Sequence, residues 1–517
     1  MTTDLFATLT TPNGVRYSQP LGLFINNEWV ESRENDRIVS VSPIDESEIC
    51  TVHGAGALDI DDAVKAARQA FEQSWRDTDA SIRGDLINKL AQLIEKHADT
   101  LAAIETWDNG TAYFSLRISP LTCIPGKTIQ AARYEDIPES INVLKYYAGW
   151  ADKLTGQLIS NNPHKLAYTT REPLGVCGAI IPWNFPLSMV AYKVGPALAA
   201  GNTMVLKPAE QTPLSALYFA QLVKEAGLPP GVLNIVNGYG RKAGVAIAEH
   251  PDINKISFTG STPTGREIMK LASTTMKRVT LETGGKSPMI ILKDADIEQA
   301  VQWAHVGIMS NQGQVCSATS RIFVHKDIYD DFIKRYIEKV ESAKVGDPFE
   351  SDTFQGPQVT RSQFERVLSY IECGKQEGAT LATGGSAYKN VNGKQGLWIS
   401  PTVFTNVEEN MKISQEEVFG PFVVISKFST EEEAIQRANN SSFGLGGAVF
   451  TQDITKAHVI ARRLETGTVW INSSNDADVR VPFGGHKQSG IGHELGELGI
   501  LAYTTSKSVH VNLASKL

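Results

Sequence analysis

Apolar residues recur along the chain with two different spacings. Between residues 81 and 104 they fall mostly three or four positions apart with charged residues between them, which predicts an amphipathic surface helix. From Gly175 onward, short apolar runs such as "GVCGAIIP" and "GNTMVLKP" alternate with helix-like segments such as "TPLSALYFAQLVKEAG". Runs followed by helices are typical of β-α units in a parallel sheet that is buried on both faces.

The same alternation resumes after about Lys286 and predicts a second α/β unit. The runs "SPMIILKDA" and "SRIFVHKDI" predict strands, while 297–309 and "IYDDFIKRYIEKVESA" predict helices. Towards the end, "GLGGAVFT" and "GTVWINSS" predict strands separated by the helix-like "ITKAHVIARRLET". The closing "AYTTSKSVHVNL" alternates with period 2 and predicts a strand, whose neighbour could come from its own domain or from another subunit.

Composition indicates an ordinary water-soluble protein. At roughly 150 residues per domain, 517 residues suggest about three structural units, and 42% hydrophobic with 21% charged residues is close to the globular average. The 49 Lys and Arg against 57 Asp and Glu give a net charge of −8, which is the wrong sign for a nucleic-acid partner. No apolar run is long enough to span a bilayer, so a membrane is not expected as a partner either.

The cysteines predict a reducing compartment. They are scattered, odd in number and without C-x-x-C spacing, which predicts neither a disulfide framework nor a metal site. The five are Cys50, Cys123, Cys177, Cys316 and Cys373. Because the start of the sequence also lacks the pattern of a secretory signal or an organelle presequence, we expect a cytoplasmic protein.

Three polar residues stand in unusual local surroundings. Cys316 lies among small and amide residues in "NQGQVCSA", although an isolated cysteine is more often an apolar filler than a nucleophile. Glu282 follows an apolar run in "VTLETGGKSP", where enclosure would raise its pKa as a general base requires, but a solvated glutamate is the default. Asn184 stands between prolines in "IPWNFP", where it could stabilise an oxyanion or only pack at a strand end.

Two glycine-rich junctions are candidates for phosphate binding. The string "GYGRKAG" is one residue longer than the usual dinucleotide fingerprint and by itself predicts a turn and a helix start. The string "SFTGSTPTG" places Gly260 and Ser261 between a short apolar strand and a helix-like run, where backbone N–H groups could face a phosphate. Such junctions are common in α/β proteins, so by itself this one favours a structural turn.

Seven short motifs occur in the order found in a known family. They are "IPWNFP", "VLKPAEQTP", "FTGSTPTGR", "VTLETGGKSP", "NQGQVCSA", "EEVFGPF" and "VPFGGHKQSGIG". From about Gly22 to the carboxyl end the chain resembles the NAD(P)-dependent aldehyde dehydrogenase superfamily, closest to the tetrameric cytosolic and mitochondrial type and with fungal features. The resemblance implies an α/β fold with a Rossmann-like NAD-binding domain, an α/β catalytic domain and an oligomerisation arm of a β-hairpin and a strand.

By this resemblance Cys316 is the nucleophile, Glu282 the general base, and Asn184 the oxyanion donor, assisted by the N–H of Cys316. The implied reaction is the NAD-dependent oxidation of an aldehyde to a carboxylic acid through a thiohemiacetal and a thioester. The alternatives are a catalytically silent binding protein, a Cys-His hydrolase and a CoA-acylating dehydrogenase. The three residues together argue against the first, the lack of a histidine motif argues against the second, and Glu282 favours hydrolysis over the third.

The resemblance also implies the cofactor contacts. Glu417 and Phe419 match positions at the nicotinamide ribose and ring, and Lys207 and Glu210 match the adenosine ribose contacts. The positions matched near the pyrophosphate are Trp183, Gly260 and Ser261. Because a carboxylate at Glu210 accepts hydrogen bonds from ribose hydroxyls and repels a 2′-phosphate, NAD is expected in preference to NADP.

The family fold implies a division of the chain. Residues 1–153 and 172–284 are expected to form the NAD-binding domain, 285–484 the catalytic domain, and 154–171 with 485–517 the oligomerisation arm. By analogy we expect a homotetramer, with a homodimer as the alternative. The final strand would then find its neighbour in another subunit.

Three stretches depart from the family pattern. The chain is longer between Asn109 and Tyr146, where the extra segment at 116–131 is either a surface loop or a translated intron, and the match of both flanks favours the second. The stretch "SSNDAD" replaces aromatic positions that line the substrate tunnel, with a small residue at Ala477, so a wider or more polar mouth for bulky or polar aldehydes is expected. His486 and His493 replace other residues in the glycine-rich loop, and neither is given a catalytic role.

Overall fold

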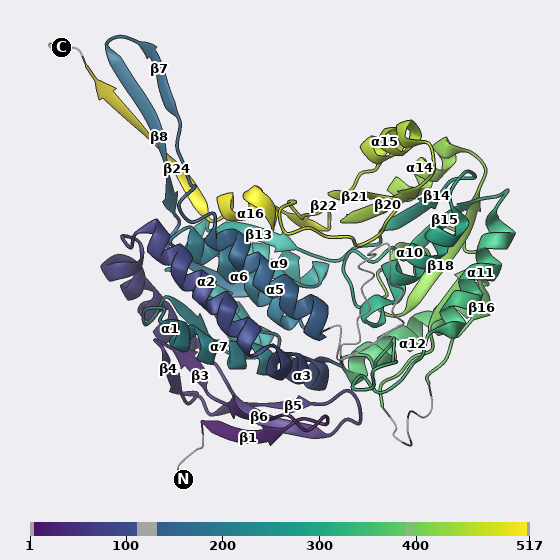
Figure 1. Ribbon diagram of the computed structural model, residues 1–517, viewed down its shortest axis with the longest axis horizontal. Helices are drawn as coiled ribbons and strands as arrows, with labels where there is room; N and C mark the ends of the chain where they lie inside the picture. Colours follow the sequence, from purple (N-terminus) through teal and green to yellow (C-terminus); the bar gives the residue numbers. More distant parts are fainter. Residues whose placement is uncertain (1–4, 111–131, 389–390, 392, 394–395, 514–517) are drawn as a thin grey trace.

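The computed structural model describes residues 5–110, 132–388, 391, 393 and 396–513. The extra segment at 116–131 lies outside these residues. The chain forms two large sheets flanked by helices in separate lobes, and a three-stranded sheet projects as an arm from the first lobe (Figure 1). The predicted α/β class is confirmed.

The first sheet has the order β23-β13-β12-β9-β10-β11-β3-β4. Its strands are β3 (Leu23–Ile25), β4 (Glu28–Val30), β9 (Val176–Ile180), β10 (Thr203–Lys207), β11 (Leu233–Ile235), β12 (Lys255–Thr259), β13 (Arg278–Glu282) and β23 (Gly490–Ile491). The strands from β13 to β11 are parallel, and antiparallel pairs close both ends. From β9 the chain continues to β10 and β11 on one side and then to β12 and β13 on the other, so a topological switch point lies between β9 and β12.

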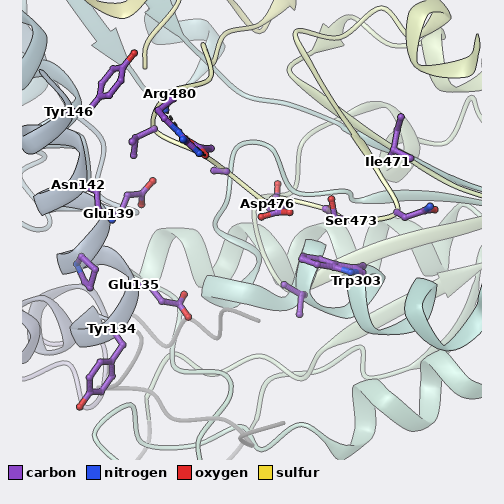
Figure 2. Close-up of a pocket in the computed structure, with 18 of the residues that line it drawn as sticks. Tyr134, Glu135, Glu139, Asn142, Tyr146, Trp303, Ile471, Ser473, Asp476 and Arg480 are labelled. Atoms are coloured by element: carbon purple, nitrogen blue, oxygen red, sulfur yellow. Dashed lines mark hydrogen bonds and ion pairs between the residues drawn. The ribbon is translucent and has the colours of Figure 1, made fainter. Parts of the chain in front are cut away.

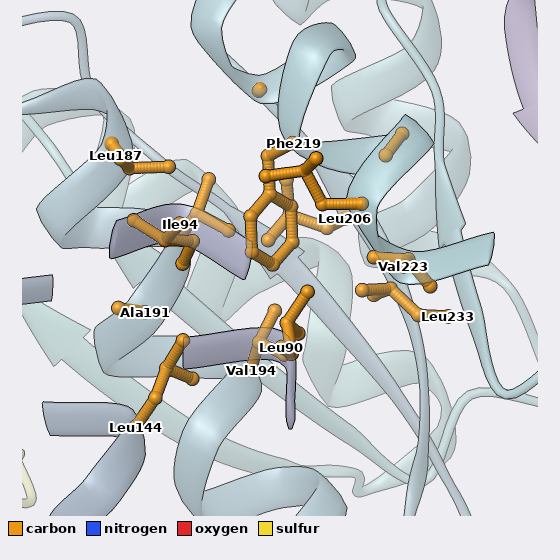
Figure 3. Packing of buried hydrophobic residues seen from close by; sticks show 14 of the residues in the cluster. Leu90, Ile94, Leu144, Leu187, Ala191, Val194, Leu206, Phe219, Val223 and Leu233 are labelled. Carbon is orange, nitrogen blue, oxygen red and sulfur yellow. The ribbon is translucent and has the colours of Figure 1, made fainter. Parts of the chain in front are cut away.

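Helices cover both faces of this sheet because side chains alternate along each strand. On β10, Met204 and Leu206 pack against one set of helices (Figure 3), while Val205 packs against another set. The first set is α2 (Ala80–Lys96), α5 (Ile137–Ala148), α6 (Pro186–Ala199) and α7 (Leu214–Ala226); the second is α1 (Ala57–Ala70), α8 (Val245–Glu249) and α9 (Thr262–Ala272). Burial on both faces explains the continuous apolar runs in the sequence.

The second sheet has the order β16-β17-β18-β15-β14-β20-β21 and is parallel except for the β16–β17 pair. Its strands are β14 (Pro288–Ile291), β15 (Arg321–His325), β16 (Thr380–Thr383), β17 (Thr402–Thr405), β18 (Phe422–Phe428), β20 (Gly446–Phe450) and β21 (Thr468–Ile471). One face packs on α10 (Ile297–Met309) and α11 (Tyr329–Ser342), and the other on α14 (Glu431–Asn439) and α15 (Ile454–Arg463). The helix predicted over 297–309 is confirmed at both ends.

The arm consists of β7 (Leu158–Asn162), β8 (Lys165–Pro173) and β24 (Thr504–Asn512) in the order β24-β8-β7. The predicted final strand is present, and the neighbour that the structure shows for it comes from its own chain; a second neighbour from another subunit stays a prediction. β24 pairs antiparallel with β8 of the same chain along its whole length, from Thr504 opposite Pro173 to Asn512 opposite Lys165. The hairpin offers β24 this edge because β7 occupies only the other edge of β8.

The remaining elements connect these sheets. They are β1 (Phe6–Thr10), β2 (Arg16–Pro20), β5 (Asp36–Val41), β6 (Glu48–Gly54), η1 (Phe71–Trp75), α3 (Ala98–Asn109), η2 (Ala132–Asp136), η3 (Gly240–Gly244), η4 (Ser273–Thr275), η5 (Ser310–Gly313), α12 (Arg361–Gln376), α13 (Lys412–Gln415), β19 (Phe443–Gly444), β22 (His486–Lys487) and α16 (Gly496–Leu501). Within the range 485–517, β22 pairs with β19 and β23 with β13, so this part of the chain contacts both lobes before it enters the arm.

The helix predicted over 81–104 is two helices, α2 and α3, and the expectation of one helix is wrong. The break is at His97, whose backbone (φ −101°, ψ 15°) leaves the helical region and whose ring lies 2.8 Å from the Tyr218 hydroxyl. Tertiary packing on α7 thus overrides the local periodicity. Among the residues that the structure describes, no helix is both long and apolar enough to cross a bilayer.

Candidate functional site

Cys316 lies in the loop between α10 and β15, on a backbone that turns sharply. Three consecutive residues before it have left-handed conformations: Asn311 (φ 48°), Gln312 (φ 57°) and Gly313 (φ 70°). Non-glycine residues seldom adopt this region, so the surrounding structure must hold the loop in place. Gln312 donates from Nε2 to the Gly110 carbonyl at 3.1 Å, which ties the loop to the end of α3 in the other lobe.

We expect Gly313→Ala to destabilise this loop. A Cβ at Gly313 would lie 1.9 Å from the carbonyl oxygen of Gly420, besides being strained at positive φ. Chemical denaturation should show a loss of about 2 to 3 kcal/mol, with altered labelling of Cys316 by a thiol reagent. The matched control is Gly378→Ala, because Gly378 also has positive φ (+91°) but nothing within 4 Å of its Cβ position. Equal losses in both variants would contradict the close contact with Gly420.

Cys316 is partly buried and lies near two carboxylate side chains. Burial, as the largest cause, together with the negative charges of Glu282 and Glu417 raises its pKa to about 12. The N–H groups of Ser317 and of Cys316 itself oppose the rise. The structure therefore brings Glu282 and Glu417, far apart in the sequence, within electrostatic range of one sulfur, which remains a thiol until a base removes its proton.

Glu282 is the last residue of β13, and its side chain is 3% exposed. Neither carboxylate oxygen has a hydrogen-bond partner in the described part of the chain. Burial holds the pKa of Glu282 well above the usual range of a carboxyl, the charge of Glu494 raises it further, and Lys193 lowers it. A buried carboxylate with no partner and a raised pKa is what a general base needs.

Two glycines after Glu282 allow the lobes to approach each other. A Cβ at Gly285 would lie 2.4 Å from the carbonyl oxygen of Cys316, and a Cβ at Gly284 would lie 2.3 Å from a carboxylate oxygen of Glu417. Only glycine permits these contacts, and the Gly285 N–H donates to Glu417 Oε1 at 2.9 Å. The pair of glycines thus joins the end of β13 to both the Cys316 loop and the Glu417 loop.

Asn184 lies just after β9 and is bonded to the same loop. Its Nδ2 donates to the carbonyl of Gln314 at 2.9 Å, and its own carbonyl accepts from Asn311 Nδ2 at 3.0 Å. One hydrogen of the Asn184 amide is thereby fixed, so the amide stays oriented two residues before Cys316. The second hydrogen can serve another acceptor.

The predicted adenosine and phosphate contacts lie at the carboxyl edge of the first sheet. Lys207 ends β10, and its Nζ lies 3.1 Å from Glu210 Oε2. Glu210 also accepts from the Gly240 N–H at 3.5 Å, at the turn formed by "GYGRKAG". Desolvation raises the pKa of Glu210, but Lys207 and these hydrogen bonds outweigh it and hold the pKa below its usual value. Gly260 follows β12, and Ser261 caps α9 by accepting from the N–H of Thr264.

The remaining predicted contacts lie between this edge and Cys316. Trp183 and Phe419 pack edge to face, with ring centroids 5.4 Å apart and planes at 86°. Phe419 has a left-handed backbone (φ 62°), which a non-glycine residue seldom adopts. Burial raises the pKa of the neighbouring Glu417 to about 7. Trp183, Phe419 and Glu417 therefore supply polar and aromatic side chains between the switch point of the first sheet and the Cys316 thiol.

Comparison with known proteins decides the family. The sequence model described as "Aldehyde dehydrogenase family" matches residues 29–509. The chain belongs to the aldehyde dehydrogenase family. It is 52% identical to an aldehyde dehydrogenase of Emericella nidulans over 99% of both chains, in agreement with the expected fungal likeness, and 48% identical to human retinaldehyde dehydrogenase 3, covering 96% of this chain and 93% of that protein.

The solved structures agree with the fold. The NAD⁺ complex of the aldehyde dehydrogenase from Bacillus cereus has a TM-score of 0.91 at 48% identity, with 96% of this chain and 97% of that chain covered. This likeness extends over both lobes. The aldehyde dehydrogenase fold of the chain is therefore established independently of the motifs.

A cleft with a volume of about 1180 Å³ lies between the two lobes (Figure 2). Its walls come from η2 and α5, from α10, and from the loop 471–480 after β21, so the stretch "SSNDAD" with Ala477 lines this cleft. In this dehydrogenase, Asn475 connects the loop after β21 to the residue that follows Cys316. The Ser317 hydroxyl donates to Asn475 Oδ1 at 2.9 Å, and Asn475 Nδ2 donates to the Gly307 carbonyl at 3.0 Å.

The motif analysis missed a buried ion pair beside Glu282. Lys193 on α6, with a fully buried side chain, pairs with Glu494, and its Nζ also lies 2.6 Å from the Thr259 hydroxyl. A lysine within the apolar segment "PLSMVAYKVGPALA" was a visible anomaly, since buried lysines are rare unless paired. Glu494 offered no comparable sign. His486 and His493, to which no role was given, are exposed.

Proposed function

We propose that this aldehyde dehydrogenase oxidises an aldehyde to a carboxylic acid with NAD as cofactor, through a thioester on Cys316. The observation that carries the proposal is the meeting of Cys316, Glu282 and Asn184 at one loop, next to the carboxyl edge of the first sheet. The relatives named above are aldehyde dehydrogenases, and the Bacillus cereus structure is an NAD⁺ complex. The test is formation of NADH and carboxylic acid in equal amounts from NAD and a series of aldehydes; a lack of both would favour a catalytically silent protein.

The residues present fit a dinucleotide. The switch point of a parallel sheet is where such ligands bind in open α/β folds. Lys207 and Glu210 supply a donor and an acceptor for ribose hydroxyls, and the capped start of α9 at Ser261 offers N–H groups to a pyrophosphate. Glu417 supplies an acceptor for the second ribose. The cofactor, when bound, supplies the acceptor for the hydride that the substrate carbon loses.

The first half of the reaction joins the aldehyde carbon to the sulfur of Cys316 and oxidises that carbon. Cys316 loses its proton to water, and the thiolate attacks the aldehyde carbon. The negative charge that develops on the aldehyde oxygen is held by the second hydrogen of the Asn184 amide and by the Cys316 N–H, each worth about 3 to 4 kcal/mol in comparable sites. Loss of hydride from this carbon leaves a thioester on Cys316.

The second half hydrolyses the thioester. Glu282 takes a proton from a water molecule, the hydroxide attacks the carbonyl carbon, and the C–S bond breaks to give a carboxylic acid and the Cys316 thiol after protonation. Burial is the largest cause of the raised pKa of Glu282, and the nearby Lys193–Glu494 pair adjusts it, since Glu494 raises this pKa and Lys193 lowers it.

The division and assembly of the chain are also proposals. We assign 1–153 and 172–284 to the NAD-binding domain, 285–484 to the catalytic domain, and 154–171 with 485–517 to an oligomerisation arm. The projecting arm sheet, with strand edges outside both lobes, supports assembly into a homotetramer or a homodimer in the cytoplasm. Light scattering of the purified protein distinguishes the two states.

We expect Glu210→Gln to relax the choice of cofactor. Glu210 is held in its charged form by Lys207 and would repel the 2′-phosphate of NADP. Its loss should lower the ratio of kcat/KM for NAD over NADP by about 10-fold, which corresponds to about 1.4 kcal/mol. Steady-state kinetics with each cofactor at a fixed aldehyde concentration measures this ratio. An unchanged ratio would contradict the role of Glu210 in selecting NAD.

A further inference from the structure

The carboxyl end of α3 contacts the segment that carries Asn184. Asn109 is the last residue of α3 and is fully buried, and its Nδ2 donates to the carbonyl of Trp183. One turn earlier, Glu105 Oε1 accepts from the N–H of Leu187 at 2.7 Å, at the start of α6. Residues four positions apart lie on the same face of a helix, so one face of α3 holds this segment on both sides of Asn184.

The same helix end also holds the Cys316 loop. Gly110 ends α3 in a left-handed conformation (φ 75°), and its carbonyl accepts from Gln312 Nε2 at 3.1 Å. A Cβ at Gly110 would lie 2.8 Å from Pro43 Cγ and 2.9 Å from Pro357 Cγ, so only glycine fits between these rings. Two consecutive residues at this helix end therefore contact the two segments that supply the proposed oxyanion donor and the nucleophile.

Two hydrogen bonds fix the backbone on either side of the Asn184 side chain. The peptide group before it contains the Trp183 carbonyl, to which Asn109 donates. The peptide group after it contains the Asn184 carbonyl, which accepts from Asn311 Nδ2 at 3.0 Å. Because each peptide group is planar, fixing two successive groups fixes the direction of the Cα–Cβ bond between them. Asn109 thus helps to direct the Asn184 amide, in addition to the bond that this amide donates to Gln314.

We propose that Asn109 is a positioning residue for the oxyanion donor, which sets the direction of the Asn184 amide through its hydrogen bond to Trp183. The proposal rests on the proposed function and adds to it a residue that lies outside the seven motifs. The oxyanion develops only as the thiolate attacks, so a misdirected amide lowers the rate of that step and leaves cofactor binding intact. A residue that only supported the fold would not separate the two effects.

The test is Asn109→Ala in the full-length protein, with single-turnover NADH formation followed by rapid-mixing absorbance at saturating NAD. We expect the rate constant to fall about 10- to 100-fold, because small displacements at a reacting centre have effects of this size. The Kd for NAD and the rate of Cys316 labelling by a thiol reagent should stay within a factor of about two. Asn109→Asp keeps the shape of the side chain but offers no N–H, so it should show the same loss if alanine weakens the fold.

The matched control is Asn439→Ala. Asn439 is also the last residue of a helix, α14, and its Nδ2 donates to a backbone carbonyl of a distant segment, that of Arg463, at 2.8 Å. This bond does not involve the Asn184 segment or the Cys316 loop. The single-turnover rate constant of this variant should therefore stay within a factor of about two of the unchanged protein.

A double-variant cycle tests whether Asn109 acts through Asn184. If it does, Asn109→Ala should slow the single turnover by less than about two-fold in an Asn184→Ala background. Equal fractional losses in both backgrounds, unchanged rate constants in Asn109→Ala and Asn109→Asp, or equally slowed labelling of Cys316 would each overturn the proposal, while aldehyde oxidation itself would stand. A lack of NADH formation by the unchanged protein would instead contradict the proposed function.

Discussion

Replacing Cys316 with alanine should abolish NADH formation. The thiolate forms the bond on which both halves of the proposed reaction depend, so we expect kcat to fall by more than about 10⁴-fold. Because Cys316 is half-buried and its side chain is small, the fold should tolerate alanine. Steady-state NADH absorbance at saturating NAD and aldehyde measures the loss, and thermal unfolding with and without NAD checks that the fold and cofactor binding remain.

The matched control for this variant is Cys373→Ala. Cys373 is also a free, partly exposed cysteine, but it lies on α12, away from the loop that carries Cys316. Its replacement should leave kcat within a factor of about two. If Cys316→Ala kept measurable turnover while binding NAD normally, the covalent mechanism would be wrong.

Replacing Glu282 with glutamine should stall the enzyme after one oxidation. Without a base to activate water, the thioester persists, so we expect a burst of about one NADH per active site followed by turnover about 10²- to 10⁴-fold slower than in the intact enzyme. Rapid-mixing absorbance resolves the burst, and mass spectrometry should detect the acyl group on Cys316. Glu497→Gln, an exposed glutamate on α16, is the control of equal charge change.

The pH dependence of kcat tests the role of Glu282 independently. Only the ionised form accepts a proton from water, and burial holds its pKa well above the usual 4.5, so hydrolysis should slow as pH falls through this raised pKa. Because the charge of Glu494 contributes to the rise, Glu494→Gln should move this limb of the kcat profile to lower pH. Absence of a burst in Glu282→Gln would place Glu282 in thiol activation instead of hydrolysis.

The local sequence does not predict which distant residues line the same cleft. "SSNDAD" predicted a polar mouth, but the facing carboxylate of Glu139 lies on a helix more than 300 positions away and belongs to no motif. The Lys193–Glu494 pair is similar, since its partners are 301 residues apart. Sequence spacing carries no information on such pairs, because the fold alone sets which side chains face each other.

The sequence by itself determined the α/β class, most strands and helices, and the identity of Cys316, Glu282 and Asn184 as candidates. These follow from short-range physics, namely hydrophobic periodicity, and from motifs whose residues are contiguous. Only the tertiary structure decided that α2 ends at His97, that β24 pairs with β8 of its own chain, and that two glycines let β13 reach the Cys316 loop. Each of these depends on contacts between segments distant in the chain, where close packing rather than local preference sets the geometry.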